Sequence, residues 1–260
     1  MKKWRLLKLD VNDASTNMAI DEAITTTRVG DHVSNTLRFY RWNPSAVSIG
    51  RFQNMLNEVN AEKCREHGVD IVRRITGGGT VYHDSQDEIT YSVVVKESDF
   101  GTADVVYAYN KICSGLIEAA RNLGVNANFS PGDPRNCPNL AVAGKKISGS
   151  AQYHKGGVLL QHGTFLLDVD LEMMFTYLRV PWAETISSVV CVAKEKITSI
   201  KVELNRAVSV QEACEALVDG FQKALGMKLV EEPLTEEEQQ LASRLKEEKY
   251  SKDGWNLRGT

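Results

Sequence analysis

The sequence lacks long apolar runs and has almost no excess charge of either sign. No apolar stretch approaches the roughly 20 residues that span a bilayer, and the apolar run near the N-terminus is too short and too charged for a signal peptide. Lys and Arg number 31 against 34 Asp and Glu, a net charge of −3, which is not the basic footprint of a nucleic-acid-binding protein. We therefore expect a cytoplasmic protein that binds neither membranes nor nucleic acid.

Cysteine is also scarce and unpaired in its spacing. The five cysteines form no CxxC motif, and no His/Cys/Asp cluster has the spacing of a zinc site. This pattern suits a reducing compartment better than a disulfide scaffold. The positions are Cys64, Cys113, Cys137, Cys191 and Cys214.

What the sequence does contain is enough chain for one large domain. At 260 residues and 42% hydrophobic content, it can bury a core without staples. Most predicted strands precede residue 170 and most late helices follow it, which indicates a single α+β domain over 1–260, with a helical portion from about 205 to 260 packed on it. We expect strands at 36–42, 88–96 and 158–167, and helices at 16–29, 104–123, 210–225 and 235–249. In the first helix, Asp21 and Glu22 are read as early acidic residues that favour a helix N-terminus.

Three polar segments interrupt these elements. The first has three consecutive glycines, Gly77–Gly79, after Arg74 and before His83. Such glycines allow backbone N–H groups to approach an anion, and the arginine can pair with a phosphate or carboxylate. A glycine-rich hairpin with surface arginines is the plain alternative. The segment matches neither a Walker loop nor GxGxxG.

The second segment places Lys145 and Lys146 at a glycine turn, where Lys146 can stabilise charge on an acyl carbonyl or phosphate if it points inward. A solvated turn with outward lysines is the alternative. The third segment, Gln161–Thr164, interrupts an apolar strand, and its His162 is either a satisfied core histidine or a site residue. Cys137, nine residues before Lys146, is either incidental or a nucleophile.

Taken in order, seven segments resemble the lipoate–protein ligase and octanoyltransferase family, a branch of the biotin/lipoate protein ligase fold. They cover nearly the whole chain. They are Asn17–Ala23, Arg38–Pro44, Ser48–Gln53, Arg73–Gly79, Gly144–Ala151, Gln161–Thr164 and Glu248–Asn256. The resemblance implies a mixed, largely antiparallel sheet core with flanking helices, and a tunnel for a medium-length acyl chain.

The resemblance also implies chemistry and site residues. A lipoate–protein ligase activates lipoate or octanoate with ATP and Mg²⁺ to an acyl-adenylate. It then transfers the acyl group to a lysine of a lipoyl domain in 2-oxoacid dehydrogenase or glycine-cleavage proteins. Carried over by position, Lys146 is the catalytic residue, and the expected ATP or acyl-adenylate contacts are Arg74, Gly77, Gly78, Gly79, Thr80, Val81, Tyr82, Lys146 and Ala151. The expected lipoate pocket comprises His83, Ser150, His162 and Gly163, with Asn139 as a nucleotide or metal contact.

Finer features divide the family. The triple glycine and Thr164 resemble the ATP-dependent ligases, as does the lack of a cysteine at 129–133, where the cysteine-dependent transferases place theirs. Asn139 departs from the Asp common in ligases and removes a negative charge that would favour a metal. We therefore expect the catalytic subunit of a two-protein ligase, completed by a small accessory subunit. The alternative is an octanoyltransferase or lipoyl amidotransferase that uses Cys137. A biotin ligase lacks support because no GRGRxxR-type loop is present, and the presence of Arg74 and Lys146 argues against a non-enzymatic binding protein.

Overall fold

A six-stranded sheet forms the centre of the protein. The computed structural model describes residues 2–101, 104–130, 140–183 and 185–257. The strand order is β10 (Ser150–Lys155), β11 (Val158–Leu166), β6 (Glu88–Lys96), β2 (Thr36–Trp42), β1 (Lys2–Asn12) and β12 (Met227–Glu231). The pairs of β1 with β2 and β12 are parallel and the other three pairs are antiparallel. The prediction of a mixed, largely antiparallel sheet is confirmed.

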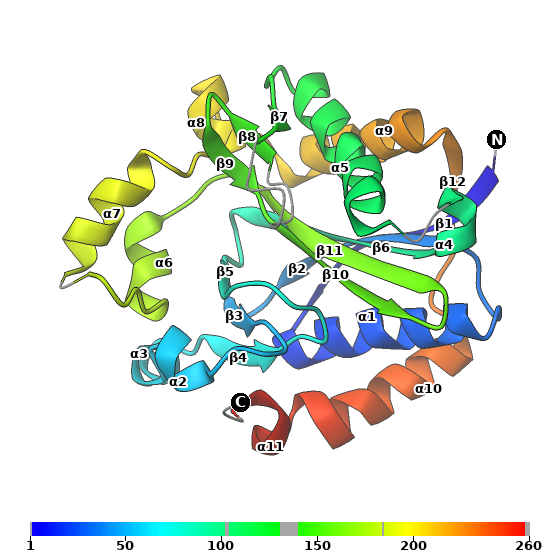
Figure 1. Cartoon of the computed structure of the whole chain (residues 1–260), viewed down its shortest axis with the longest axis horizontal. Coiled ribbons are helices and arrows are strands. Elements are labelled where there is room, and N and C mark those ends of the chain that lie inside the picture. Colours follow the sequence, from blue (N-terminus) through cyan, green and yellow to red (C-terminus); the bar gives the residue numbers. More distant parts are fainter. Residues whose placement is uncertain (1, 102–103, 131–139, 184, 258–260) are drawn as a thin grey trace.

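Two small sheets flank the central one. One has the order β4 (Asp70–Arg73), β3 (Ala46–Ile49) and β5 (Val81–His83), and the other has the order β7 (Asn128–Phe129), β8 (Leu140–Val142) and β9 (Lys145–Ser148). The first of these sheets ends at the glycine segment and the second contains Lys146. The two small sheets therefore place both sequence hallmarks beside the central sheet (Figure 1).

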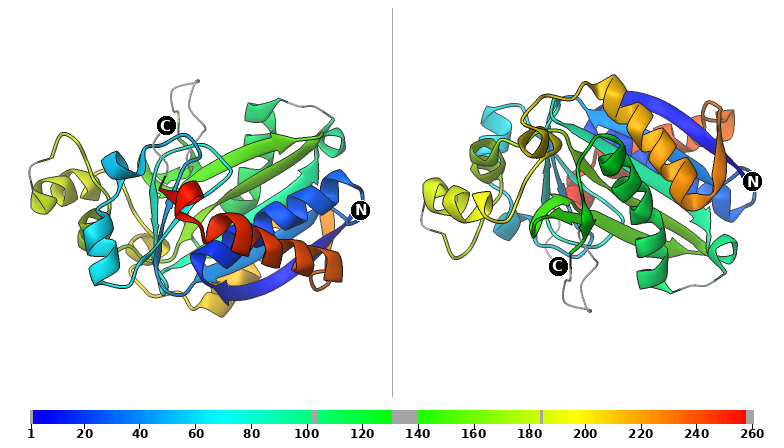
Figure 2. Two further views of the ribbon diagram at one scale, coloured as in Figure 1. Left: turned by 90° about the horizontal axis from the view of Figure 1, so that it is seen from below. Right: turned by 90° about the horizontal axis from the view of Figure 1, so that it is seen from above.

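Four long helices cover the two faces of the central sheet. Helices α1 (Ala14–Val29) and α10 (Glu236–Leu245) lie on one face, and α5 (Val105–Asn122) and α9 (Val210–Leu225) lie on the other (Figure 2). Each pair buries an apolar cluster against the sheet, because apolar residues recur at helical spacing along one side of each helix. The close approach of α5 and α9 depends on Gly220, where a Cβ would lie 2.5 Å from the carbonyl oxygen of Gly115.

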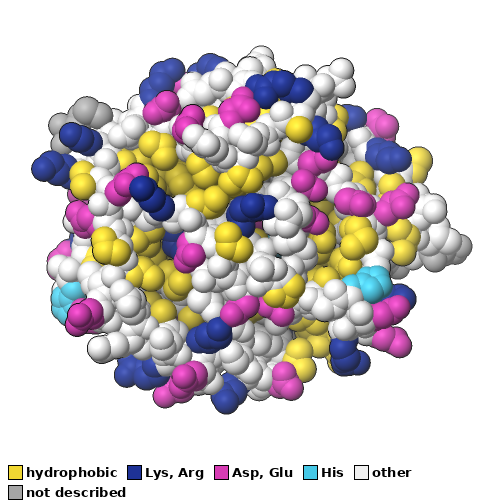
Figure 3. Space-filling model, turned by 180° about the vertical axis from the view of Figure 1, so that it is seen from behind, with side chains coloured by type: hydrophobic (Ala, Val, Ile, Leu, Met, Phe, Trp, Pro, Cys, Tyr) yellow, Lys and Arg dark blue, Asp and Glu magenta, His cyan; other side chains and the backbone are white. Residues whose placement is uncertain are grey.

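Shorter helices complete the chain. They are α2 (Met55–Glu58), α3 (Ala61–Glu66), α4 (Glu97–Phe100), α6 (Leu171–Tyr177), α7 (Ile186–Lys194), α8 (Ile200–Leu204), the π-helix η1 (Lys246–Tyr250) and α11 (Asp253–Asn256). Within the described ranges, no helix is long and apolar enough to cross a membrane. On the face opposite that of Figure 1, charged side chains of both signs are interspersed with shallow apolar hollows (Figure 3).

Most predicted elements lie where the sequence pattern placed them. β2 and β6 match their predicted ranges, β11 ends one residue early, and α10 begins one residue after the predicted start, with a capping box of Thr235 and Glu238. Strand β1 and the edge strand β12 were not predicted, nor were α7 and α8. Helix α1 begins earlier than predicted, with Asp13 as its N-cap, so Asp21 lies in mid-helix and is buried instead of serving the helix terminus.

Candidate functional site

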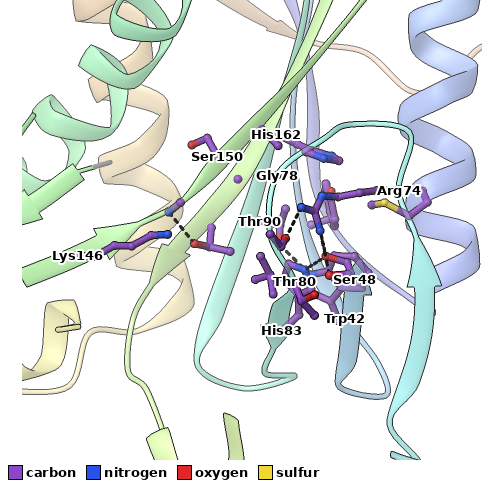
Figure 4. A pocket seen from close by; sticks show the side chains of 18 residues that line it. Trp42, Ser48, Arg74, Gly78, Thr80, His83, Thr90, Lys146, Ser150 and His162 are labelled. Carbon is purple, nitrogen blue, oxygen red and sulfur yellow. Dashed lines mark hydrogen bonds between the residues drawn. The ribbon is translucent and has the colours of Figure 1, made fainter. Parts of the chain in front are cut away.

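A cavity of about 130 Å³ lies between the β3–β5 sheet and strands β10 and β11. Figure 4 shows Lys146 on one side of it, with Arg74, Ser48, His83 and Trp42 gathered on the other. Six of the seven segments that carried the resemblance contribute lining residues, and Glu248–Asn256 contributes none. They are Met18, Tyr40, Trp42, Ser48, Arg74, Gly78, Gly79, Thr80, Val81, His83, Thr90, Lys146, Gly149, Ser150, Ala151, His162, Gly163 and Thr164.

The Arg74 side chain holds the glycine loop through several hydrogen bonds. Its Nε donates to Thr76 Oγ1 (3.1 Å), and its Nη1 donates to the carbonyl (2.9 Å) and hydroxyl (3.0 Å) oxygens of Ser48. Its Nη2 donates to the carbonyl oxygens of Gly77 (2.9 Å) and Gly79 (2.5 Å). A guanidinium has five N–H donors, so all of them are engaged within the protein. Arg74 thus shapes the loop, whereas the sequence suggested that it pairs with a substrate anion.

Burial lowers the pKa of Arg74 to about 10, and the group still stays charged at neutral pH. Its charge is therefore held in the wall of the pocket and solvated by carbonyl dipoles.

Two buried histidines reach Arg74 through hydroxyl groups. His83 Nε2 lies 2.8 Å from Ser48 Oγ, and His162 Nε2 lies 2.8 Å from Thr76 Oγ1. Because Arg74 donates to both hydroxyl oxygens, each hydroxyl is free to donate its own proton to the imidazole beside it. Both Nε2 atoms are then acceptors, so each neutral ring has its proton on Nδ1.

Each histidine meets a buried carboxylate at Nδ1. Glu88 Oε1 accepts from His83 at 2.8 Å, and Asp21 Oδ2 accepts from His162 at 3.0 Å. Asp21 also accepts from Arg38 (2.9 Å). Burial opposes the ionisation of Asp21, but the bond from His162 and the charge of Arg38 outweigh it and lower its pKa. Burial lowers the pKa of His162, in part offset by Asp21.

An aromatic wall continues from His83. The ring of Trp42 stacks on it with 4.1 Å between centroids, and the indole N–H donates to Thr90 Oγ1 (2.8 Å). Together with Met18 and Tyr40, Trp42 gives this end of the cavity an apolar lining. Such a surface suits a hydrocarbon chain, because binding removes apolar area from water.

Lys146 faces this wall from β9. Its backbone is fixed on both sides, since its N–H donates to the Lys196 carbonyl (2.7 Å) and its carbonyl accepts from the Thr198 N–H (2.9 Å). Gly149 leaves room for the ammonium, because a Cβ there would lie 2.7 Å from Lys146 Nζ. Within the described ranges, no acceptor lies within hydrogen-bond distance of Nζ, which leaves its donors for a ligand.

The Lys146 side chain keeps solvent access, yet protein surrounds its ammonium on most sides. This desolvation, followed by the like charge of Arg74, lowers the pKa of Lys146 below that of a free lysine.

The structure brings most of the predicted site residues together. Gly78, Gly79, Thr80, Val81, Ala151 and the four predicted pocket residues all line the cavity. Tyr82 does not, because neighbouring residues of a strand face opposite sides. Its ring packs against Tyr177, with 5.2 Å between centroids, on the far side of the small sheet. Gly77 also lies outside the lining and contributes its carbonyl to Arg74.

Several site residues received no role from the sequence. Asp21, Ser48 and Glu88 support the two histidines, and Trp42 and Thr90 form the apolar end. Asp21, Trp42 and Ser48 lie inside segments that carried the resemblance. A buried residue with a polar group in such a segment was the sequence feature that could have identified them as site residues.

Cys137 and Asn139 lie outside the described residues. Among the described residues that line the cavity, none is Asp or Glu, and no group of three His, Cys, Asp or Glu is arranged to hold a metal. Mg²⁺ prefers carboxylate and other oxygen ligands. The described pocket therefore does not supply the donor set that a Mg²⁺ site needs.

Comparison with known proteins adds independent findings. The family model for the lipoyl protein ligase A/B catalytic domain matches residues 13–222. The chain is 41% identical to the octanoyltransferase LipM of Symbiobacterium thermophilum, over 98% of each chain. It is 37% identical to LipM of Brevibacillus brevis, over 99% of this chain and 100% of that protein.

Solved structures of ligases share the fold. A bi-partite lipoate protein ligase of Thermoplasma acidophilum, described with its E2 lipoyl domain, is 31% identical with a TM-score of 0.86, over 99% of this chain and 96% of that one. A lipoate-protein ligase A bound with ATP is 30% identical with a TM-score of 0.85, over 99% of both chains. The names of the sequence relatives agree with the predicted alternative, an octanoyltransferase. The ATP-dependent ligase stays a prediction.

Proposed function

Because this chain belongs to the lipoyl protein ligase A/B catalytic-domain family, we propose that it transfers an octanoyl group from a thioester donor, such as octanoyl-acyl carrier protein, to the acceptor lysine of a lipoyl domain. The observation that carries this proposal is the 41% identity to an octanoyltransferase across 98% of both chains. The apolar end of the cavity beside Trp42 suits the acyl chain.

The charges around the cavity support a neutral acyl donor. Arg74 uses its five N–H donors in hydrogen bonds to the glycine loop, Ser48 and Thr76. Of the described lining residues, Lys146 is then the cation whose donors are available to a ligand. One ammonium suits the single negative charge that develops on an acyl carbonyl oxygen during attack. A triphosphate carries more negative charge than this one ammonium can balance.

Two covalent routes lead to the same product. In one, the Cys137 thiolate attacks the donor thioester, the carrier thiol leaves, and the acceptor amine then displaces the thiolate to form the amide. In the other, the acceptor amine attacks the donor thioester directly. In both, the role of Lys146 is to stabilise the oxyanion.

The test offers the purified chain an apo lipoyl domain with three acyl sources: octanoyl-acyl carrier protein, octanoate with ATP and Mg²⁺, and lipoate with ATP and Mg²⁺. Intact-mass spectrometry reads the acyl adduct. We expect transfer from the thioester without ATP. An adduct that forms only in the ATP arms would refute the proposal.

Substitution of Cys137 separates the two routes. Cys137→Ser abolishes transfer and the acyl-enzyme mass if Cys137 is the nucleophile, and leaves transfer intact if the amine attacks directly. Cys191→Ser is the matched control, because Cys191 is an exposed free thiol on α7.

A second candidate, an ATP-dependent lipoate ligase, is favoured by the 31% and 30% identity to solved ligases, one of them with bound ATP. The Thermoplasma ligase is bi-partite, so this candidate predicts a separate accessory subunit here. The two reactions above that contain ATP and Mg²⁺ test this candidate. It predicts that the amount of acyl adduct depends on ATP and rises when a small accessory protein is added.

A further inference from the structure

Arg73 lies beside the pocket arginine but faces the other way, toward the C-terminal segment. Its side chain is fully buried. Nε donates to the Trp255 carbonyl (3.0 Å) and Nη2 to the Asn256 carbonyl (3.2 Å). Its backbone adds two bonds, from Arg73 N to Asn256 Oδ1 (2.9 Å) and from Trp255 Nε1 to the Arg73 carbonyl (2.7 Å). Helix α11 is thereby fixed against β4.

The remaining arm of the Arg73 guanidinium holds a loop next to the pocket. Nη1 lies within hydrogen-bond distance of three carbonyl oxygens, those of Gly50 (3.0 Å), Arg51 (3.2 Å) and Gln53 (2.7 Å). One planar group thus bridges the C-terminal segment and the loop 50–53. A lysine ammonium cannot match this geometry, because its donors radiate from a single point.

The loop 50–53 is in turn packed on the glycine loop that lines the cavity. Its Arg51 N–H donates to the Thr76 carbonyl (2.9 Å), and Gln53 Oε1 accepts from Thr80 Oγ1 (3.0 Å). Gly50 approaches so closely that a Cβ would lie 2.1 Å from the Gly78 carbonyl oxygen. Gly78 and Thr80 line the cavity, so a shift of the loop 50–53 moves the cavity wall.

The C-terminal segment has a second anchor, on α1. Tyr250 Oη and Lys249 Nζ both donate to Glu22 Oε2, at 2.5 and 2.6 Å. The Asn256 side-chain amide donates to the Tyr250 carbonyl (2.7 Å). The segment therefore runs from α1 to β4, where its last helix, α11, lies (Figure 2).

We propose that Arg73, Trp255 and Asn256 form a positioning strap that sets the geometry of the glycine loop for acyl binding. This proposal rests on the proposed acyl transfer at the same cavity. Arg73 touches no substrate in this scheme and acts through the loop 50–53. The bonds of Arg73 named above fix the C-terminal segment and the loop 50–53 relative to each other.

The test measures steady-state transfer from octanoyl-acyl carrier protein by the full chain, with Trp255→Phe and Asn256→Ala combined to remove two bonds between the segment and Arg73. Tyr250→Phe is the matched control, because it removes a bond from the same segment to Glu22. For the arginine, Arg73→Lys is compared with Arg5→Lys. Arg5 is an equally buried arginine that holds α10 through Glu238, away from the cavity.

We expect KM for the acyl donor to rise about tenfold in the Trp255–Asn256 variant and in Arg73→Lys, with kcat changed less than about threefold. Both controls keep KM within about twofold at a similar loss of stability in urea. Equal KM changes in the strap variants and their controls would overturn the proposal. If Arg73→Lys fails to fold, the Trp255–Asn256 variant alone decides the outcome.

Calorimetric binding of octanoate keeps this proposal separate from the proposed function. If the unmodified chain transfers no acyl group, the proposed transfer fails. The strap then still predicts about tenfold weaker octanoate binding in the Trp255–Asn256 variant than in Tyr250→Phe, and equal binding in the two would refute it.

Discussion

Replacing Gly163 with alanine should damage both the stability and the activity of this protein. Gly163 lies on β11 opposite Ser150 of β10. A Cβ at this position would lie 2.4 Å from the Gly149 carbonyl oxygen and 2.5 Å from Ser150 Oγ, whereas real Cβ contacts are essentially never under 3.0 Å. The two strands must therefore separate by about half an ångström or more at this point.

Two effects oppose each other in the stability change. Alanine in a strand recovers roughly 0.5–1 kcal/mol of backbone entropy relative to glycine. Overpacking costs about 1–3 kcal/mol, and more where backbone atoms must move. The clash involves the Gly149 carbonyl, which accepts from the Thr164 N–H. We therefore expect a net loss of about 1–2 kcal/mol in the free energy of unfolding.

The effect on activity should be larger, because Gly149 also makes room for the Lys146 ammonium. A displacement of 1 Å in a reacting geometry costs on the order of 100-fold in rate. We expect kcat/KM for octanoyl transfer to fall at least about tenfold. The assays are urea unfolding and steady-state transfer to an apo lipoyl domain.

Gly77→Ala is the matched control. No atom lies within 4 Å of a Cβ at Gly77, and its backbone does not adopt the left-handed conformation. The free energy of unfolding of this variant should lie within about 1 kcal/mol of that of the unmodified chain. The reasoning is wrong if Gly163→Ala is as stable and as active as the unmodified chain, or if Gly77→Ala loses as much stability.

Three further outcomes are expected. Lys146→Met should lower kcat/KM by about 100- to 1,000-fold with little change in urea stability, whereas Lys145→Met, which removes a surface bond to a carbonyl, should leave kcat/KM nearly unchanged. Asp21→Asn should cost about 3–5 kcal/mol of unfolding free energy in urea, because it leaves the buried Arg38 charge uncompensated. Stability should also fall with acid in two ranges, read as the urea midpoint against pH. The lowered pKa of His162 makes the unfolded chain take up a proton first, so stability falls as pH drops below about 6.5. The lowered pKa of Asp21 means that its contribution is lost as pH falls below about 3.8. A flat profile over both ranges would contradict the assignment of these shifts.

Local patterns predicted the central strands and the long helices because those elements are long and strongly periodic. β6 and β11 are nine-residue strands that are buried on both faces, and α9 has a clear apolar stripe. Strands β1 and β12 were missed for a physical reason. β12 has only five residues, two of which are charged (Lys228 and Glu231), and β1 mixes lysines with leucines, so neither has the pattern of a buried strand. Their pairing is a tertiary contact between residues more than 200 positions apart.

The site residues also fall into those that the local sequence identified and those that it did not. The glycine loop, Lys146 and the Gln161–Thr164 segment were identified because unusual residue types lie close together in sequence. The partners of these residues were not, because topology supplies them. Asp21 meets His162 across 141 positions, and Thr76 meets His162 across 86. No local pattern encodes such pairs, so the role of Asp21 was mistaken for a helix-end charge.

The orientation of Arg74 bears most directly on the chemistry. A sequence shows an arginine before three glycines, and the natural inference is an anion-binding group. In the structure, the same guanidinium is held by five bonds, and the two hydroxyls among its partners are themselves hydrogen-bonded to His83 and His162. To reach a phosphate, Arg74 would have to release the carbonyls of Gly77 or Gly79 and so reshape the loop. An acyl thioester makes no such demand, because Lys146 already faces the cavity. A phosphate contact by Arg74 therefore requires a rearranged glycine loop, whereas the oxyanion-stabilising role proposed for Lys146 does not.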